Sequence, residues 1–215
     1  MSLRRTVFPA AVMVCCLMAI RTASAAVPRP ADIIGFEPGA DYRLLTSEQI
    51  VRYFRALDEA SDRMIVEEIG TTALGRPIIM ALISSPENLG RLGEIKSINK
   101  RLALAKGLSD GEAAKLSQEG VATVWIDGGL HGMELGGSHL MPALAYWLVT
   151  DESREAQRIR ANVLLLLNPN MNPDGLDIVS SWYAEHVGTA FETSSAPEAA
   201  HAHVGNDINR DWYMF

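Results

Sequence analysis

The sequence predicts an α/β fold with a mixed, largely parallel central sheet flanked by helices. Two continuous apolar runs, 121–126 and 163–167, have the length and composition of strands buried on both faces. From residue 121 onward, strands of this kind alternate with segments of helical periodicity, which favours a βαβ arrangement. Two earlier β-rich runs, 64–69 and 78–84, are joined by turn residues and are typical of a hairpin.

The expected helices share a start signal, in which a capping residue precedes apolar residues spaced three or four apart. Thr46 with Gln49 and Ser109 with Glu112 have the spacing of capping boxes, and Pro86 suits the first position of a helix. We therefore expect helices over residues 46–60, 86–106, 109–118, 140–149 and 153–161.

The first 25 residues have the three-part layout of a cleavable signal peptide. Arg4 and Arg5 make a positive start, residues 7–20 are nearly all apolar, and Ala-Ser-Ala at 23–25 offers a cleavage pattern of small residues. The apolar run is too short to span a membrane comfortably, so a transmembrane anchor is the weaker alternative. We expect a secreted or periplasmic protein without stable membrane insertion.

Composition narrows the classes of function. The net charge of −7 excludes the strongly basic footprint of a nucleic-acid-binding protein. Both cysteines, Cys15 and Cys16, lie in the first 25 residues, so the mature chain would have neither a disulfide nor a thiolate site. Residues 26–41, rich in proline and glycine, are expected to form an irregular lead-in to a domain that covers 42–215.

The candidate site is the glycine-rich loop at 127–134, which reads Asp-Gly-Gly-Leu-His-Gly-Met-Glu. A histidine and a glutamate three residues apart can aim an imidazole and a carboxylate at one point when the backbone turns, and both are good ligands for zinc. The loop follows the carboxyl end of a buried strand, where open α/β sheets place ligands. His131 and Glu134 are therefore candidate metal ligands. A loop histidine beside a glutamate that starts a helix is the alternative.

Two further polar elements follow. Residues 168–175, reading Asn-Pro-Asn-Met-Asn-Pro-Asp-Gly, predict a rigid turn in which Asn and Asp bond their own backbone and Gly175 supplies an unrestricted φ. At 207–212, Asn209 and Arg210 can hold a carboxylate, the guanidinium through two bonds and the amide through one more. The alternative is a surface Arg210 that pairs with Asp211.

These three elements, in this order, resemble the carboxypeptidase A type of zinc metallopeptidase over residues 42–215. The resemblance implies a carboxypeptidase-like fold, bound Zn2+, and His131 and Glu134 as two of three zinc ligands. Asp207 would accept a hydrogen bond from His131 and orient it. Asn209 and Arg210 would grip the C-terminal carboxylate of a peptide or protein substrate.

The sequence also departs from the family pattern. Met133 stands where a polar or charged residue is usual, and Ala184-Glu185 stand where an arginine that stabilises the oxyanion is usual. In the family, the third ligand and the general-base glutamate follow the Asn-Arg pair, so both are expected beyond Phe215. We therefore expect this chain to be a fragment that is inactive alone. Four other histidines are weaker candidates for the third ligand: His139, His186, His201 and His203.

The predicted function of the full-length protein is that of a zinc metallocarboxypeptidase, which releases C-terminal residues. Two alternatives stay open. One keeps the site but changes the substrate, as in a zinc amidohydrolase that acts on acyl-amino acids or cell-wall peptides. The other is a non-catalytic peptide- or metal-binding module. A histidine and then a glutamate beyond Phe215 would favour an enzyme, and their absence would favour the binding module.

Overall fold

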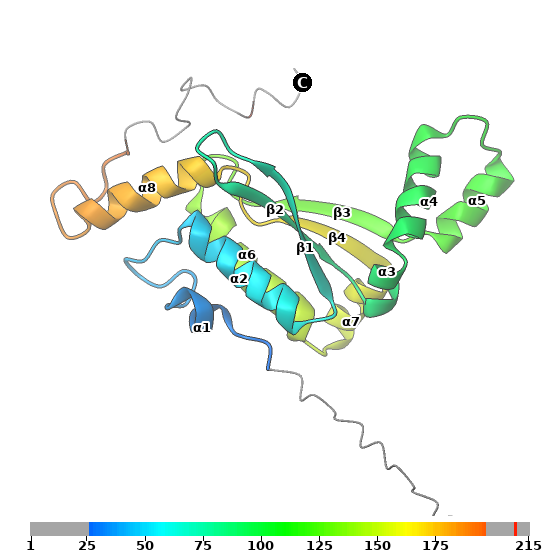
Figure 1. Ribbon diagram of the computed structural model, residues 1–215, viewed down its shortest axis with the longest axis horizontal. Helices are drawn as coiled ribbons and strands as arrows, with labels where there is room; N and C mark the ends of the chain where they lie inside the picture. The colour runs from blue at the N-terminus through cyan, green and yellow to red at the C-terminus, as the bar shows by residue number, and fades with distance from the viewer. Residues whose placement is uncertain (1–25, 197–208, 210–215) are drawn as a thin grey trace, which may run out of the picture.

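The computed structural model describes residues 26–196 and Asn209 (Figure 1). Its centre is a four-stranded sheet in the order β1-β2-β4-β3. The strands are β1 (Met64–Thr71), β2 (Pro77–Ile83), β3 (Ala122–Asp127) and β4 (Val163–Asn168). β1 pairs with β2 and β2 pairs with β4 in antiparallel orientation, and β3 pairs with β4 in parallel. The predicted α/β class and mixed sheet are confirmed. Among the described strands, β3 and β4 form the one parallel pair.

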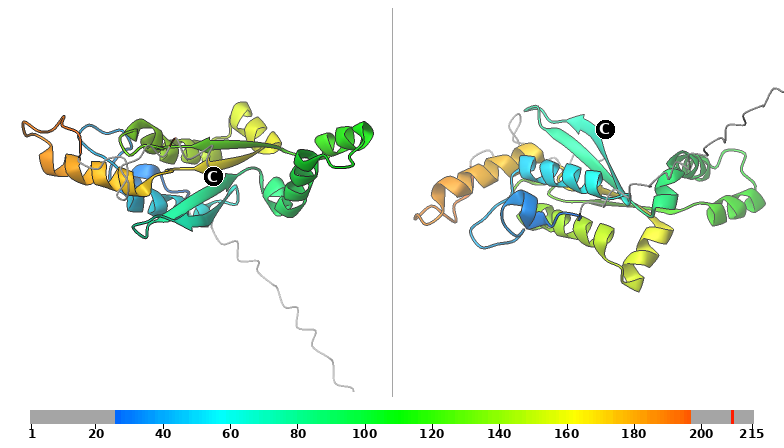
Figure 2. Two further views of the ribbon diagram at one scale, coloured as in Figure 1. Left: turned by 90° about the horizontal axis from the view of Figure 1, so that it is seen from above. Right: turned by 60° about the horizontal axis from the view of Figure 1, so that its bottom comes forward.

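Side chains pack on both faces of the sheet at β2, and the alternation of β2 residues separates two cores. Ile79, Ala81 and Ile83 pack toward α2 (Ser47–Ala60) and α6 (Leu135–Thr150), which contact each other (Figure 2). Met80 and Leu82 pack on the opposite side, with residues of the helices that follow β2. Because successive strand residues point to opposite faces, the continuous apolar run of β2 serves both cores.

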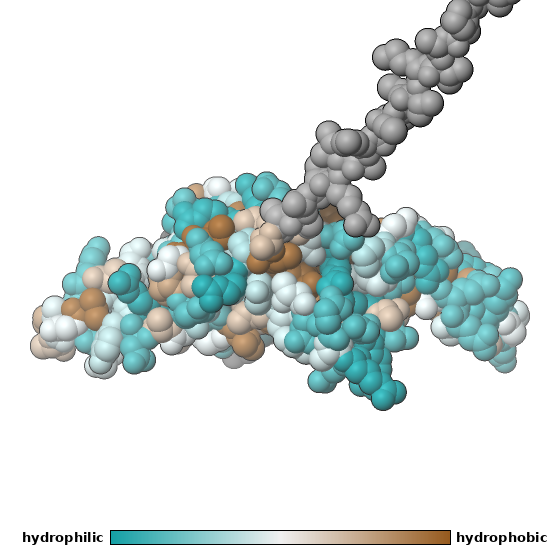
Figure 3. All heavy atoms as spheres, turned by 90° about the horizontal axis from the view of Figure 1, so that it is seen from below, coloured by the Kyte–Doolittle hydropathy of each residue, from teal (hydrophilic) through white to brown (hydrophobic). Residues whose placement is uncertain are grey.

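The remaining helices lie around this centre, and several begin where the sequence predicts. Thr46 and Gln49 form the expected capping box of α2, and the Ser109 side chain caps α5. The other helices are α1 (Pro30–Ile34), α3 (Pro86–Gly90), α4 (Leu92–Leu104), α5 (Asp110–Glu119), α7 (Arg154–Asn162) and α8 (Pro173–His186). α4 and α5 project beyond the sheet as a helical hairpin, and this end of the molecule is mainly hydrophilic in Figure 3.

Four predicted boundaries are corrected by the structure. The lead-in at 26–41 is not wholly irregular, because Pro30 starts the short helix α1. The single helix expected at 86–106 is two helices, because Arg91 leaves helical geometry between Gly90 and Gly93, and glycine weakens helices. α6 starts at Leu135 rather than at residue 140, and a helix, α8, begins inside the expected turn at 168–175.

The prediction that the strand at 121–126 is buried on both faces is wrong for most of its residues. Val124 is 41% exposed and Trp125 is 47% exposed. In the described part of the chain, β3 is the outermost strand and pairs with β4 alone, so one edge has no strand beside it there. The equivalent prediction for β4 is confirmed, because β4 lies between two strands and its residues are mostly buried.

In the described residues, no helix is long and apolar enough to cross a membrane. The predicted signal peptide at 1–25 lies outside the described residues.

An exposed, apolar strand edge is a site of association between chains, so we expect the 215-residue chain to self-associate through β3. Trp125→Lys should shift the chain toward the monomer in analytical ultracentrifugation, because a charged side chain opposes edge-to-edge pairing. Leu104→Lys is the matched control, since Leu104 is 67% exposed on α4, away from the sheet. An equal effect of both changes would contradict association through β3.

Candidate functional site

The loop between β3 and α6 brings the two predicted ligands together. Nδ1 of His131 lies 2.9 Å from Oε1 of Glu134, and the backbone N–H of His131 donates to Oε2 of Glu134 at 3.0 Å. The N–H of Glu134 in turn donates to the carbonyl of His131, which closes a tight turn. The His131 side chain is 26% exposed and that of Glu134 is 52% exposed, so both can be reached from solvent. An imidazole nitrogen and a carboxylate oxygen thus meet at the carboxyl end of β3.

Two glycines make this loop conformation accessible. Gly129 has a φ of 60°, and a Cβ built on it would lie 2.1 Å from Oγ of Ser138. A Cβ on Gly132 would lie 2.4 Å from the backbone carbonyl of Gly175, at the start of α8. Since real Cβ atoms do not approach backbone so closely, the loop can rest on α8 only with glycine at position 132.

The segment that supports the loop is a succession of asparagine turns. Oδ1 of Asn168 accepts from the N–H of Asn170 at 2.9 Å, and Oδ1 of Asn170 accepts from the N–H of Asn172 at 3.1 Å. Oδ1 of Asn172 then accepts from the N–H of Gly175 at 2.9 Å and caps α8. These bonds agree with the predicted rigid turn, in which each asparagine fixes backbone two or three residues ahead.

The role predicted for Gly175 is corrected. Gly175 does not have a positive φ, because it lies in the first turn of α8. It is needed for space instead, since a Cβ there would lie 2.6 Å from the Asn172 side chain. The Gly132 backbone also packs closely against Gly175. The sequence did carry the helix signal, namely an asparagine cap followed by proline at the first position.

Backbone bonds tie the asparagine segment to the candidate loop. The N–H of Gly128 donates to the carbonyl of Asn168 at 3.0 Å, and the N–H of Met171 donates to the carbonyl of Gly128 at 2.8 Å. The loop after β3 and the turn after β4 are therefore held as one unit. This arrangement follows from the parallel pairing of the two strands, whose carboxyl ends meet at one edge.

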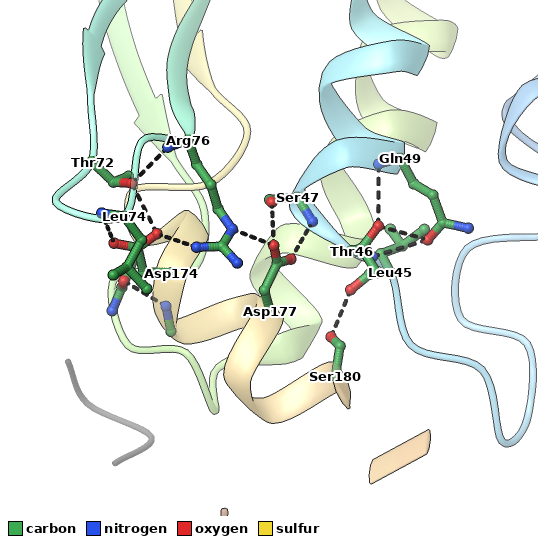
Figure 4. A network of polar contacts seen from close by, with 12 residues as sticks. Leu45, Thr46, Ser47, Gln49, Thr72, Leu74, Arg76, Asp174, Asp177 and Ser180 are labelled. Carbon is green, nitrogen blue, oxygen red and sulfur yellow. Dashed lines mark hydrogen bonds and ion pairs between the residues drawn. The ribbon is translucent and has the colours of Figure 1, made fainter. Parts of the chain in front are cut away.

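A charged network, which the sequence analysis did not identify, holds α8 in place (Figure 4). Asp174 accepts hydrogen bonds from the Thr72 hydroxyl at 2.8 Å, from the Leu74 N–H at 3.2 Å and from Arg76 at 2.8 Å. The hairpin turn between β1 and β2 is thereby fixed to the first turn of α8. In the sequence, Gly75, Arg76 and Pro77 indicate only the turn of the hairpin, because the partners of Arg76 lie about a hundred residues away.

The second carboxylate of this network extends it to α2 (Figure 4). Asp177 accepts from Nε of Arg76 at 2.5 Å and from both the N–H and the hydroxyl of Ser47 at 2.7 Å. Because Ser47 is the first residue of α2, the dipole of that helix also favours the Asp177 carboxylate beside it. Arg76, Asp174 and Asp177 therefore link the hairpin, α2 and α8 through charge-assisted bonds.

His139 has a structural role, which removes it as a candidate third ligand. Nε2 of His139 accepts from the N–H of Leu45 at 2.8 Å, so Nδ1 carries the proton and donates to the carbonyl of Leu135 at 2.7 Å. Both ring nitrogens are thus used by backbone groups, and the residue is buried. Burial lowers the pKa of His139 below its ordinary value of 6.5.

The other predicted site residues are only partly visible. The His186 ring stacks on Trp182, and its Nδ1 lies 2.7 Å from the Trp182 carbonyl oxygen. His201, His203, Asp207 and Arg210 lie outside the described residues, and Asn209 is described and exposed. Within the described part of the chain, no three histidine, cysteine or acidic side chains form a group that could hold a metal ion.

Comparison with known proteins shows which protein family this chain resembles. The sequence model of the zinc carboxypeptidase family matches residues 50–215. A search of curated proteins found no match. A metallo-carboxypeptidase from Burkholderia cenocepacia is 19% identical and aligns with 62% of this chain and 28% of its own, with a TM-score of 0.42. Carboxypeptidase A from Helicoverpa armigera is 16% identical, and the alignment covers 68% of this chain and 31% of the carboxypeptidase, with a TM-score of 0.45. The chain thus spans about a third of the length of these structures.

The contact between Gly132 and Gly175 predicts that alanine at position 132 destabilises the fold, whereas alanine at position 136 does not. Gly132→Ala should lower the free energy of unfolding by about 1–3 kcal/mol, because its Cβ must displace backbone rather than a flexible side chain. Gly136→Ala is the control, since nothing lies within 4 Å of a Cβ there, and alanine should stabilise α6 by about 0.5–1 kcal/mol. Urea unfolding of both variants measures the difference, and similar values for the two would contradict the contact.

His139 predicts a loss of stability in mild acid. Its folded-state pKa is depressed, so its contribution is fully present above pH 6.5 and is lost as the pH falls below that value toward the folded pKa. The slope for one proton is at most about 1.4 kcal/mol per pH unit. His139→Gln should remove this component from unfolding curves measured between pH 5 and about 8, whereas His186→Gln should retain it. An unchanged pH dependence in His139→Gln would refute the assignment.

Proposed function

Since the chain belongs to the zinc carboxypeptidase family, we propose that it forms part of a zinc metallocarboxypeptidase that releases C-terminal residues from peptides. One observation carries the proposal, namely the approach of His131 Nδ1 and Glu134 Oε1 to 2.9 Å inside the region that the family model matches. The layout of residues 1–25 supports export, and so a secreted or periplasmic location.

The donor set of the loop fits zinc. Imidazole nitrogen and carboxylate oxygen are ordinary zinc ligands, and catalytic zinc takes three protein ligands and keeps one position for water or substrate. His131 and Glu134 would supply two of the three. When bound, zinc supplies a Lewis acid that makes a water molecule nucleophilic near neutral pH. The third ligand and the general base are proposed to come from residues that follow Arg210 in the full-length protein.

The residues of this chain prepare the site in two ways. The bond from the His131 N–H fixes Oε2 of Glu134, so Oε1 stays turned toward the imidazole. The glycine contact with α8 and the asparagine turns fix the backbone beneath both side chains. A preorganised pair loses less conformational freedom on binding a metal than two mobile side chains would.

Substrate selection is proposed to rest on Asn209 and Arg210, which would grip the terminal carboxylate of the peptide. Asp207 would accept a hydrogen bond from His131 and hold the imidazole in one orientation. These roles rest on the sequence pattern at 207–210. They make exo-cleavage a consequence of charge pairing, because an internal peptide bond has no carboxylate for Arg210 to bind.

In the full-length protein, Arg210→Ala should lower kcat/KM for peptides with a free C-terminus by roughly ten- to a hundredfold, since a charge-assisted bond is worth about 1.5–3 kcal/mol. Arg210→Lys should restore the rate only in part, because an ammonium cannot make the planar two-point contact. Release of C-terminal residues is measured for matched free-acid and amidated peptides, with and without a zinc chelator.

Arg158→Ala, which removes a similar charge from an exposed position of α7, is the control and should leave the rates unchanged. An equal loss on free-acid and amidated peptides would exclude the carboxylate grip. Hydrolysis of acyl-amino acids but not of peptides would replace the proposal with an amidohydrolase, and the absence of any zinc-dependent hydrolysis would refute the proposed reaction.

A further inference from the structure

A small pocket of about 180 Å³ lies beside the candidate loop. Its inner side includes Met133 and Leu135, which flank the predicted ligand Glu134 in the chain, and Trp182 and Tyr183 of α8 line it as well. The pocket is therefore adjacent to the place where a substrate of the proposed enzyme would react. Met133 is 61% exposed, so its apolar side chain is available to a ligand rather than committed to the core.

The outer wall of the pocket is the segment 192–196, which hydrogen bonds hold against α8. The indole N–H of Trp182 donates to the Ser194 hydroxyl at 3.2 Å. The carboxylate of Glu192 accepts from the Gly188 N–H at 2.8 Å and from the Tyr183 hydroxyl at 3.5 Å. The segment thus follows the end of α8 and turns back along it, and the pocket has a defined shape.

Size and chemistry limit what the pocket can take. Pockets for drug-sized ligands and cofactors usually measure about 300–1,000 Å³, so this one suits a single side chain rather than a whole small molecule. Its walls are mainly apolar and aromatic. Glu192 is its one charged group among the described residues, and no basic side chain there lines the pocket.

We propose that this pocket is a specificity subsite that binds one apolar or aromatic side chain of the peptide substrate, and that Glu192 disfavours acidic side chains at the same position. The inference rests on the proposed function, because it takes a peptide to lie across the loop at 131–134. Apolar burial supplies the affinity, and repulsion between carboxylates supplies the discrimination.

Peptide binding to the zinc-free, full-length protein tests the subsite without hydrolysis. The probes are acetylated tetrapeptides with a free C-terminus, made of glycine except for one Phe or Glu placed at each position in turn, with tetraglycine as reference. Isothermal titration calorimetry should show that Phe at one position binds at least about ten-fold more tightly than Gly. Glu at that position should bind more weakly than Gly.

Three variants connect these preferences to the pocket. Tyr183→Ser removes one wall and should reduce the preference for Phe. Glu192→Gln should abolish the discrimination against Glu, whereas Glu155→Gln, an equal charge change at an exposed position of α7, should leave it intact. Circular dichroism melts confirm that each variant is folded, and Glu192→Gln still tests the proposal if Tyr183→Ser does not fold.

The proposal is overturned if Phe at every position binds no better than Gly, if no peptide binds, or if Glu192→Gln behaves like Glu155→Gln. Failure of the subsite can be told from failure of the proposed reaction. Hydrolysis by the zinc-loaded protein without any side-chain preference would leave the reaction standing and remove the subsite. A side-chain preference in binding without hydrolysis would leave the subsite standing and remove the proposed reaction.

Discussion

The contact between the backbones of Gly132 and Gly175 is the constraint on which the site depends. It joins the loop after β3 to the first turn of α8 at a distance that leaves no room for a Cβ at position 132. The asparagine turns at 168–175 set the position of Gly175, and the two parallel strands set the distance between loop and turn. The orientation of His131 and Glu134 is therefore decided by backbone packing beneath them as well as by their own bonds.

α8 can serve as this support because it is itself anchored from the other side. Its two carboxylates, Asp174 and Asp177, bind Arg76 and the groups around it, and Ser180 donates to the carbonyl of Leu45 at 2.7 Å. His139 binds the N–H of the same Leu45 residue. The chain before α2 is thus held by α6 and α8 together, and these bonds connect the hairpin, α2, α6 and α8 into one framework.

Features that depend on neighbours in sequence were predictable, and those that depend on distant partners were not. The capping box of α2, the Ser109 cap of α5 and the β1–β2 hairpin are local, and the structure has them where the sequence indicates. The Arg76 network joins residues about a hundred positions apart, so no local pattern announces it. The exposure of β3 likewise depends on what covers its two faces and lies beside its edge, which an apolar run does not encode. α8 was missed because asparagine, proline and glycine suggest a turn, although the same residues cap a helix.

In the proposed function, the loop would serve the reaction and the pocket would serve recognition, and both rest on α8. The loop would offer two ligands, and a catalytic zinc needs three, so tight metal binding would require a segment that carries the third. Metal binding would then fasten that segment to the loop, because the binding free energy stabilises the arrangement that assembles all the ligands. Met133 and Leu135 lie on either side of Glu134, so any movement of the loop on metal binding would also change the inner wall of the pocket. The close packing of Gly132 on Gly175 would therefore serve recognition as well as metal binding, since it would hold the pocket wall and the proposed ligand in one fixed relation.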